Sequence, residues 1–204
     1  MTVHAPVAAK GRTLVVGSTG FIGRFVAEAS LASGRPTFLL VRPGPASTSK
    51  ALTGSIRDRD SLGKVLKEYE IEVVISAVGG GCILDQLVLV DAIKGAGTVK
   101  RFLPSEFGHE IDRADPVEPG LTMYIQKRQV RRAIEAAGIP YTYICCNSIA
   151  AWPYHDNTHP ADVLPPLDRD ADIEVTSLYP DASFRSIDEC FDDFLARFTG
   201  GCRR

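Results

Sequence analysis

The chain has 204 residues, 45% of them hydrophobic and 24% charged, so it can bury a core and is expected to form one domain with a small appendage. A formal net charge of -2 excludes the basic surface by which proteins bind nucleic acid or an anionic membrane. The N-terminal stretch lacks the apolar centre of a signal peptide and no apolar run could span a bilayer, so we expect a cytosolic, cytoplasmic protein.

Apolar periodicity predicts strands that alternate with helices. The strands are expected at residues 13–16, 36–41, 72–76, 99–103 and 141–145. The helices are expected from 21 to about 33, and at 58–69, 83–93 and 122–137. This order implies an α/β fold, in which a doubly wound parallel sheet carries helices on both faces.

The chain becomes less regular after the last predicted strand. Four prolines among scattered aspartates predict a loop over residues 151–172. Ser186 and Glu189 form a capping box that opens an apolar stripe at helical spacing, which predicts an amphipathic helix over 186–198. We therefore expect a domain at 11–150 and a smaller segment at 151–204.

The segment Gly17-Ser18-Thr19-Gly20-Phe21-Ile22-Gly23 follows the first strand directly and opens the first helix. Glycines at these spacings let the backbone turn sharply and approach a diphosphate, whose charge the N–H groups of the helix N-terminus attract. The alternative is a purely structural tight turn. The strand and helix on either side favour dinucleotide binding.

Arg42, at the end of the second strand, indicates which dinucleotide is bound. An NAD site commonly has Asp or Glu there to accept from the ribose 2′-OH, whereas an arginine suits a 2′-phosphate. Lys50, in the serine-rich loop that follows, is a second candidate cation. Both side chains have the alternative of a solvated loop charge. We expect the cofactor to be NADPH.

Cysteine and histidine spacing gives no metal site. Five cysteines without paired CxxC spacing are expected to be reduced and mostly structural. Adjacent Cys145 and Cys146 should point to opposite faces of a strand, which favours core packing over redox chemistry. His155, Asp156 and His159 lie near prolines that argue against a helix able to align them as ligands.

The segment YIQKRQVRR, residues 124–132, raises a question of acid/base chemistry. Many reductases on a nucleotide-binding sheet carry tyrosine and lysine as YxxxK, whereas Tyr124 and Lys127 are three residues apart. Residues at this spacing still share a helix face. From the residues alone, Lys127 is either a working acid/base or one cation on a solvated helix.

Several motifs resemble those of plant leucoanthocyanidin reductases, in the isoflavone reductase and phenylcoumaran benzylic ether reductase group of atypical, NmrA-like short-chain dehydrogenases. They are GSTGFIG from 17, LLVRPGP from 39, RFLPSEFGH from 101, DPVEPGLTMY from 115, KRQVRRAIEAAGIPYT from 127 and ICCNSIAAWPY from 144. The match runs through most of residues 11–167 and resumes over 174–194. PSEFG is specific to the group.

The resemblance implies a Rossmann-type domain and an NADPH-dependent reduction of a flavan-3,4-diol to a flavan-3-ol, with a small flavonoid as substrate. It implies that Lys127 is the catalytic lysine and that His109 takes part in acid/base chemistry beside the substrate. Tyr124 would line the substrate pocket, and Arg131 matches a position that contacts the cofactor phosphate region. We expect Arg128 and Arg131 to lower the pKa of Lys127 by like-charge repulsion.

The chain departs from the family pattern in two places. One βα unit is expected to be absent near residues 50–54, and most of the second, substrate-covering domain is absent after about residue 167. Residues 151–204 would be the remnant of that domain. Three functions stay open: a leucoanthocyanidin reductase, an isoflavone reductase-like or phenylcoumaran benzylic ether reductase, and a catalytically silent NADP(H)-binding module that serves a partner.

Overall fold

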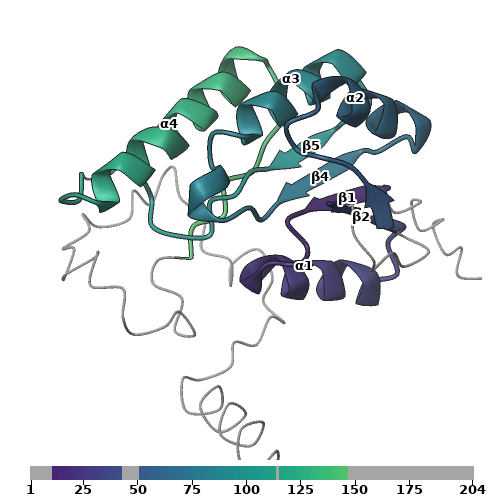
Figure 1. Cartoon of the computed structure of the whole chain (residues 1–204), viewed down its shortest axis with the longest axis horizontal. Helices are drawn as coiled ribbons and strands as arrows, with labels where there is room; N and C mark the ends of the chain where they lie inside the picture. The colour runs from purple at the N-terminus through teal and green to yellow at the C-terminus, as the bar shows by residue number, and fades with distance from the viewer. Residues whose placement is uncertain (1–10, 43–50, 114, 147–204) are drawn as a thin grey trace, which may run out of the picture. The chain divides into compact units, whose positions relative to one another are not determined.

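The computed structural model describes residues 11–42, 51–113 and 115–146 (Figure 1). All of them belong to the first of two units into which the chain divides, Met1–Asn147 and Ser148–Arg204. Lys50 and the loop and helix predicted after residue 150 lie outside the described residues, as do His155, Asp156 and His159. The predicted boundary between residues 150 and 151 stays a prediction.

Five parallel strands form one sheet in the order β3-β2-β1-β4-β5 (Figure 1). The central strand β1 is buried along its whole length and aligns Thr13 with Thr37 on one side and with Val73 on the other. The strands are β1 Thr13–Val16, β2 Thr37–Val41, β3 Ala51–Thr53, β4 Val73–Ser76 and β5 Arg101–Leu103. The predicted doubly wound, Rossmann-type α/β sheet is confirmed.

Helices cover both faces of this sheet. They are α1 Phe21–Ala32, α2 Arg59–Glu68, α3 Gln86–Ala96 and α4 Gly120–Ala136, with a short 3-10 turn η1 at Gly80–Cys82. In Figure 1, α1 lies on one face, and α2, α3 and α4 lie side by side on the other. Between these helices and the sheet the core closes around side chains such as Leu14, Val74 and Phe102.

Local chemistry explains where α2, α3 and α4 begin or end. The carboxylate of Asp58 caps α2 by accepting from the backbone N–H of Ser61 at 3.0 Å. The helix α3 ends at Gly97, and Gly138 follows the end of α4; both glycines have the left-handed φ that favours this residue. The predicted helices at 58–69 and 122–137 therefore agree with the structure to within about two residues.

The edge strand β3 corrects one expectation from the sequence. A helix and an edge strand were expected to be missing near residues 50–54, yet the strand is present, because Ala51–Thr53 pairs in parallel with Leu39–Val41 of β2. The expectation that the helix is missing stays a prediction, because residues 43–50 lie outside the described residues. Three residues are too few to show an alternating pattern, so periodicity could not reveal this strand. The sheet therefore keeps an edge strand beside β2.

The strand predicted at 141–145 is also wrong. Tyr141 forms an isolated parallel bridge with Phe102, and the described residues after it are irregular. The cause lies in the neighbouring strand, because β5 ends at Leu103 and Pro104 begins a loop. Later hydrogen bonds join the segment to that loop instead, including Cys146 N–H to the Gly108 carbonyl at 3.0 Å.

Candidate functional site

The carboxyl edge of the sheet is where the strand order places a site. The chain runs outward from β1 to β2 and β3 on one side, and to β4 and β5 on the other. Ligands of such sheets bind in the crevice at this reversal, beyond the carboxyl ends of the strands. The loop after β1, the turn after β4 and the loop after β5 all begin at this edge.

The glycine loop after β1 is packed too closely to admit larger residues. Gly17 has φ +82°, and a Cβ there would lie 2.6 Å from the carbonyl oxygen of Ala77, which follows β4. A Cβ on Gly23 would lie 1.9 Å from the Gly17 carbonyl oxygen. These two glycines bring the start of α1 against the turn, as the motif predicts.

The start of α1 suits a phosphate group. No side chain caps this helix at Gly20, and its first turn holds no acidic residue. Among the described residues, the buried hydroxyls of Ser18 and Ser76 have no hydrogen-bond partner. A buried polar atom without a partner indicates a missing group, and Ser18 lies in the glycine loop itself. The residues present therefore fit the diphosphate of a dinucleotide at a helix N-terminus.

The structure describes the other predicted cofactor residues except Lys50. Thr19 and Phe21 are exposed at the mouth of the loop, and Ile22 is half-buried. Arg42 is exposed directly after β2, which pairs with β1 up to the register Val16 with Leu40. Arg42 thus lies at the same edge as the glycine loop, where the predicted 2′-phosphate contact requires it.

The loop after β5 packs against α4, and together they carry the predicted acid/base residues. His109 lies in the loop, whereas Tyr124 and Lys127 lie on the helix. Lys127 is only 8% exposed, and its Nζ donates to the Glu106 carbonyl oxygen at 2.7 Å. Nδ1 of His109 and the hydroxyl of Tyr124 form a hydrogen bond of 2.9 Å. Tyr124 and Lys127 share the buried face of the helix, as their spacing predicts. Lys127 is therefore not a cation on a solvated helix.

Burial is the main cause that lowers the pKa of Lys127. The Glu106 carboxylate opposes this effect, and Arg131 adds to it by repulsion. The expected repulsion from Arg131 is confirmed as a smaller cause than burial, whereas Arg128 is not among the main causes of the shift. Arg128 turns elsewhere: it donates to the Ile111 carbonyl oxygen at 2.7 Å and pairs with Asp115 at 2.6 Å.

Arg131 lies in a buried ionic network rather than at an open surface. It is 3% exposed, and its guanidinium lies 4.3 Å from the ring centroid of Tyr143. Its carboxylate partners are Glu106 at 3.1 Å, Asp112 at 3.0 Å and Glu110. The contact to a cofactor phosphate region implied by the resemblance stays a prediction. These carboxylates surround the guanidinium in the described structure.

Sequence reasoning missed Glu106 and Glu110. The sequence held a signal for them, because PSEFGHE places two acids four residues apart after a strand, and the basic segment KRQVRR follows later in the chain. Both acids bind Arg131, and the thiol of Cys145 donates to Glu110 at 3.3 Å. Desolvation of its sulfur, followed by the charge of Glu110, raises the pKa of the Cys145 thiol to about 12, although the residue as a whole is exposed. Cys145 and Cys146 are exposed free thiols, so the predicted core packing was wrong.

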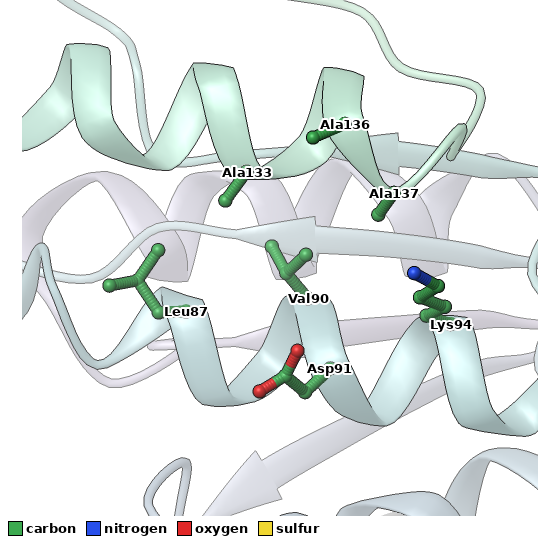
Figure 2. Close-up of a pocket in the computed structure, with 7 residues that line it drawn as sticks. All are labelled: Leu87, Val90, Asp91, Lys94, Ala133, Ala136 and Ala137. Atoms are coloured by element: carbon green, nitrogen blue, oxygen red, sulfur yellow. The ribbon is translucent and has the colours of Figure 1, made fainter.

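A separate hollow lies between α3 and α4 (Figure 2). It has a volume of about 320 Å³, and small side chains such as Ala133 and Ala137 face Val90 across it. None of the predicted site residues lines this hollow. Within the described ranges, no group of three or more His, Cys, Asp or Glu side chains could hold a metal ion, and none of the helices has the length and apolar character of a membrane span.

The sequence pattern of one family, described as NmrA-like, matches residues 9–177. The chain belongs to the NmrA-like family. A leucoanthocyanidin reductase of Desmodium uncinatum is 62% identical over 184 residues, which are 83% of this chain and 48% of that protein. The phenylcoumaran benzylic ether reductase TP7 of Nicotiana tabacum is 44% identical over 177 residues, 80% of this chain and 57% of that protein.

Solved structures of leucoanthocyanidin reductases are similar to this chain in fold and in sequence. The binary complex of leucoanthocyanidin reductase with NADPH from Vitis vinifera has a TM-score of 0.68 and 56% identity, covering 74% of this chain and 55% of that one. A ternary complex of leucoanthocyanidin reductase from the same plant gives 0.66 and 56%, covering 78% and 54%. The predicted kinship with leucoanthocyanidin reductases is confirmed. The chain spans about half the length of these NmrA-like relatives.

Proposed function

We propose that the chain is an NADPH-dependent reductase that converts a flavan-3,4-diol, a leucoanthocyanidin, into a flavan-3-ol of the catechin type. One observation carries this proposal: the glycine loop and the buried Lys127 with His109 and Tyr124 belong to the same edge of one sheet. The 62% identity to a leucoanthocyanidin reductase supports the choice of substrate class. The NADPH complex of a relative supports the choice of cofactor.

The residues that would hold the cofactor are those of the glycine loop and the end of β2. The loop from Gly17 to Gly23 would bind the diphosphate, with the Ser18 hydroxyl as a further donor. Arg42, together with Lys50, would bind the 2′-phosphate. Bound NADPH supplies the hydride that the substrate carbon accepts.

Lys127 would act first, as a base on a phenolic hydroxyl of the substrate. The electron pair left on the phenolic oxygen then forms the carbonyl of a quinone methide, and the bond between C4 and its hydroxyl breaks. That hydroxyl leaves as water after it takes up a proton, a transfer in which His109 would take part. After hydride uptake at C4, the phenolic oxygen would regain the proton from Lys127. Burial lowers the pKa of Lys127, which raises the share of the neutral amine that can act as a base.

Calorimetry followed by turnover tests this function. We expect NADPH to bind more tightly than NADH, and a 3,4-cis-diol to be converted to the flavan-3-ol when NADPH is present. Loss of both binding and turnover in a folded protein would refute the proposal. Conversion of an isoflavone or of a phenylcoumaran instead of the diol would reassign the substrate within the same family.

A second candidate is an NADP(H)-binding module that serves a partner without turnover. The chain spans 48% of the Desmodium leucoanthocyanidin reductase, and the glycine loop, which would bind the cofactor, lies wholly within the described domain. NADPH binding without turnover of any of the three substrate classes would support this candidate over the reductase.

A further inference from the structure

One residue of the loop after β5 binds two cations of α4. Lys127 and Arg131 lie one turn apart on the buried face of this helix. The carbonyl oxygen of Glu106 accepts from Lys127 Nζ at 2.7 Å. The carboxylate of Glu106 accepts from Nε of Arg131 at 3.2 Å and from its Nη2 at 3.1 Å. The backbone and side chain of Glu106 therefore fix both cations.

The fork between Glu106 and Arg131 is rigid for two reasons. The two side chains are 2% and 3% exposed, so neither can exchange its partner for water without opening the core. Two parallel N–H to oxygen bonds also fix the angle between guanidinium and carboxylate, which a single bond would leave free. Glu110 and Asp112 hold Arg131 from the more exposed side.

Stability alone is a poor explanation of this pair. A buried ion pair contributes little more than a well-packed apolar pair of the same volume, because desolvation offsets the attraction. The pair nevertheless adjoins Lys127, whose charged and titratable neighbours are Glu106, Arg131, Cys145 and Cys146. The charge of Glu106 raises the pKa of Lys127, whereas burial and the charge of Arg131 lower it.

We propose that Glu106 is a positioning residue for Lys127: Arg131 clamps the Glu106 carboxylate, and the clamp keeps the Glu106 carbonyl in place as the acceptor that orients Lys127 Nζ. Arg131 acts on Lys127 through Glu106. This inference rests on the proposed function, in which Lys127 is the acid/base group. It adds a role for two residues of the loop and helix that need touch neither substrate nor cofactor.

Competitive acetylation tests the proposal without any turnover. The protein is labelled with trace acetic anhydride between pH 6 and pH 11, and mass spectrometry gives the labelling rate at each lysine. The reactive fraction of Lys127 is its rate at pH 8 divided by its plateau at high pH. Lys64 and Lys67, both exposed on α2, serve as internal references. In the parent protein we expect a larger reactive fraction at Lys127 than at either reference.

The decisive variant is the double substitution Glu106→Gln with Arg131→Met. It removes the two charges beside Lys127, whose effects on the reactive fraction oppose each other, and it removes the clamp but keeps the backbone carbonyl. We expect the reactive fraction of Lys127 to fall about tenfold, toward that of Lys64 and Lys67, because Nζ loses its fixed acceptor and becomes hydrated. A double variant that keeps the parent fraction would overturn the proposal.

Two further variants complete the experiment. Asp112→Asn removes another carboxylate from Arg131 on the exposed side of the network, and it should leave the reactive fraction of Lys127 within twofold of the parent value. Should circular dichroism show that the double variant is unfolded, Arg131→Lys keeps the positive charge but cannot form the two parallel bonds to Glu106 that arginine forms. We expect its reactive fraction to fall as well; a fraction equal to that of the parent would overturn the proposal.

The proposed function and the positioning role of Glu106 can be refuted independently of each other. A chain that takes up neither NADPH nor the diol would refute the proposed function but would leave the fall in the double variant measurable. A chain that turns over the diol while the double variant keeps the parent reactive fraction would keep the function and lose the positioning role.

Discussion

Lys127 combines a short contact with deep burial, and together they decide its chemistry. Lys127 Nζ donates a hydrogen bond to the Glu106 carbonyl oxygen at 2.7 Å, and burial lowers the pKa of the amine. Lys127→Met keeps the length of the side chain and removes the amine. We expect kcat for the diol to fall by about 10²- to 10⁴-fold, which is the usual contribution of a general base, while NADPH affinity stays within twofold.

Product chromatography and calorimetry measure these two quantities. Lys64→Met is the matched control, because Lys64 is an exposed lysine of α2 and its loss should leave both unchanged. Turnover by Lys127→Met at the parent rate would refute the acid/base role. A parallel loss of NADPH binding would instead indicate a structural defect.

A substitution at Gly23 tests how closely the glycine loop is packed. A Cβ at this position would lie 1.9 Å from the Gly17 carbonyl oxygen, which is backbone and has no rotamer by which to move away. We expect Gly23→Ala to lower the free energy of unfolding by about 1–3 kcal/mol and to weaken NADPH binding. Urea unfolding and calorimetry measure the two effects.

Gly63→Ala is the control for this variant. Gly63 is also helical, and a Cβ there meets nothing within 4 Å. Alanine has the higher helix propensity, so this change should raise the free energy of unfolding by about 0.5–1 kcal/mol. Equal effects of the two substitutions would contradict the close packing of the loop.

What the sequence could predict differs between these residues. The glycine loop follows from local chemistry, because a strand, a turn and a helix within a few residues determine its shape. The burial of Lys127 depends on a contact with Glu106, 21 residues earlier in the chain. Helical spacing shows only that Tyr124 and Lys127 share a face, not what covers that face, so the resemblance had to decide between the two interpretations.

At the scale of elements, Glu110 joins the loop after β5 to α4 through Arg131. Burial tends to raise the pKa of Glu110, but hydrogen bonds from Arg131 and from the backbone N–H of Asp112 outweigh it, so the pKa is lowered from 4.5. A lowered pKa means that the stabilising contribution is complete above about pH 4.5 and is lost as pH falls through the folded-state value.

Glu110→Gln should therefore lower the free energy of unfolding by about 1–2 kcal/mol at pH 7, with the difference from the parent shrinking below pH 4.5. Urea titrations from pH 7 to pH 3 measure this convergence. Burial raises the pKa of Glu106, and the charge of Glu110 adds to this rise, so Glu110→Gln also brings the pKa of Glu106 closer to its ordinary value. A difference that stays constant down to pH 3 would contradict this assignment.

The elements also show why some of the fold was predicted and some was not. The bounds of β1 were predicted to the residue, because a β-branched and leucine run ends sharply at a glycine turn. The edge strand β3 has three residues and depends on pairing with β2, which periodicity cannot detect. The predicted strand at 141–145 has suitable residues, but β5 ends at Leu103, so a regular partner is missing along the described segment.

At the scale of the whole molecule, the described domain brings two sets of residues to one edge of its sheet. The glycine loop follows β1, and the loop with Glu106 and His109 follows β5, with β4 between them. A dinucleotide at the first set and a substrate at the second would meet above the end of β4, where the hydroxyl of Ser76 is buried without a partner among the described residues. This arrangement favours a reaction between two bound molecules.

We predict that Arg42 decides which cofactor this domain prefers. The exposed guanidinium follows β2 at the same edge as the glycine loop, and a 2′-phosphate would give it a charge-assisted hydrogen bond that NADH cannot form. A ligand at about 100 times its Kd stabilises the folded state by about 2.7 kcal/mol, which corresponds to a rise in Tm of roughly 5–10 °C for a chain of this size. We expect this rise in Tm with NADPH and a smaller one with NADH.

The variant Arg42→Ala should remove most of the difference between the two cofactors, with Lys50 retaining the rest. The control Arg35→Ala changes an exposed arginine before β2 and should leave the difference intact. Equal shifts with the two cofactors in the parent protein, measured by thermal unfolding, would refute the preference for NADPH, and an unchanged difference in Arg42→Ala would transfer it to another cation.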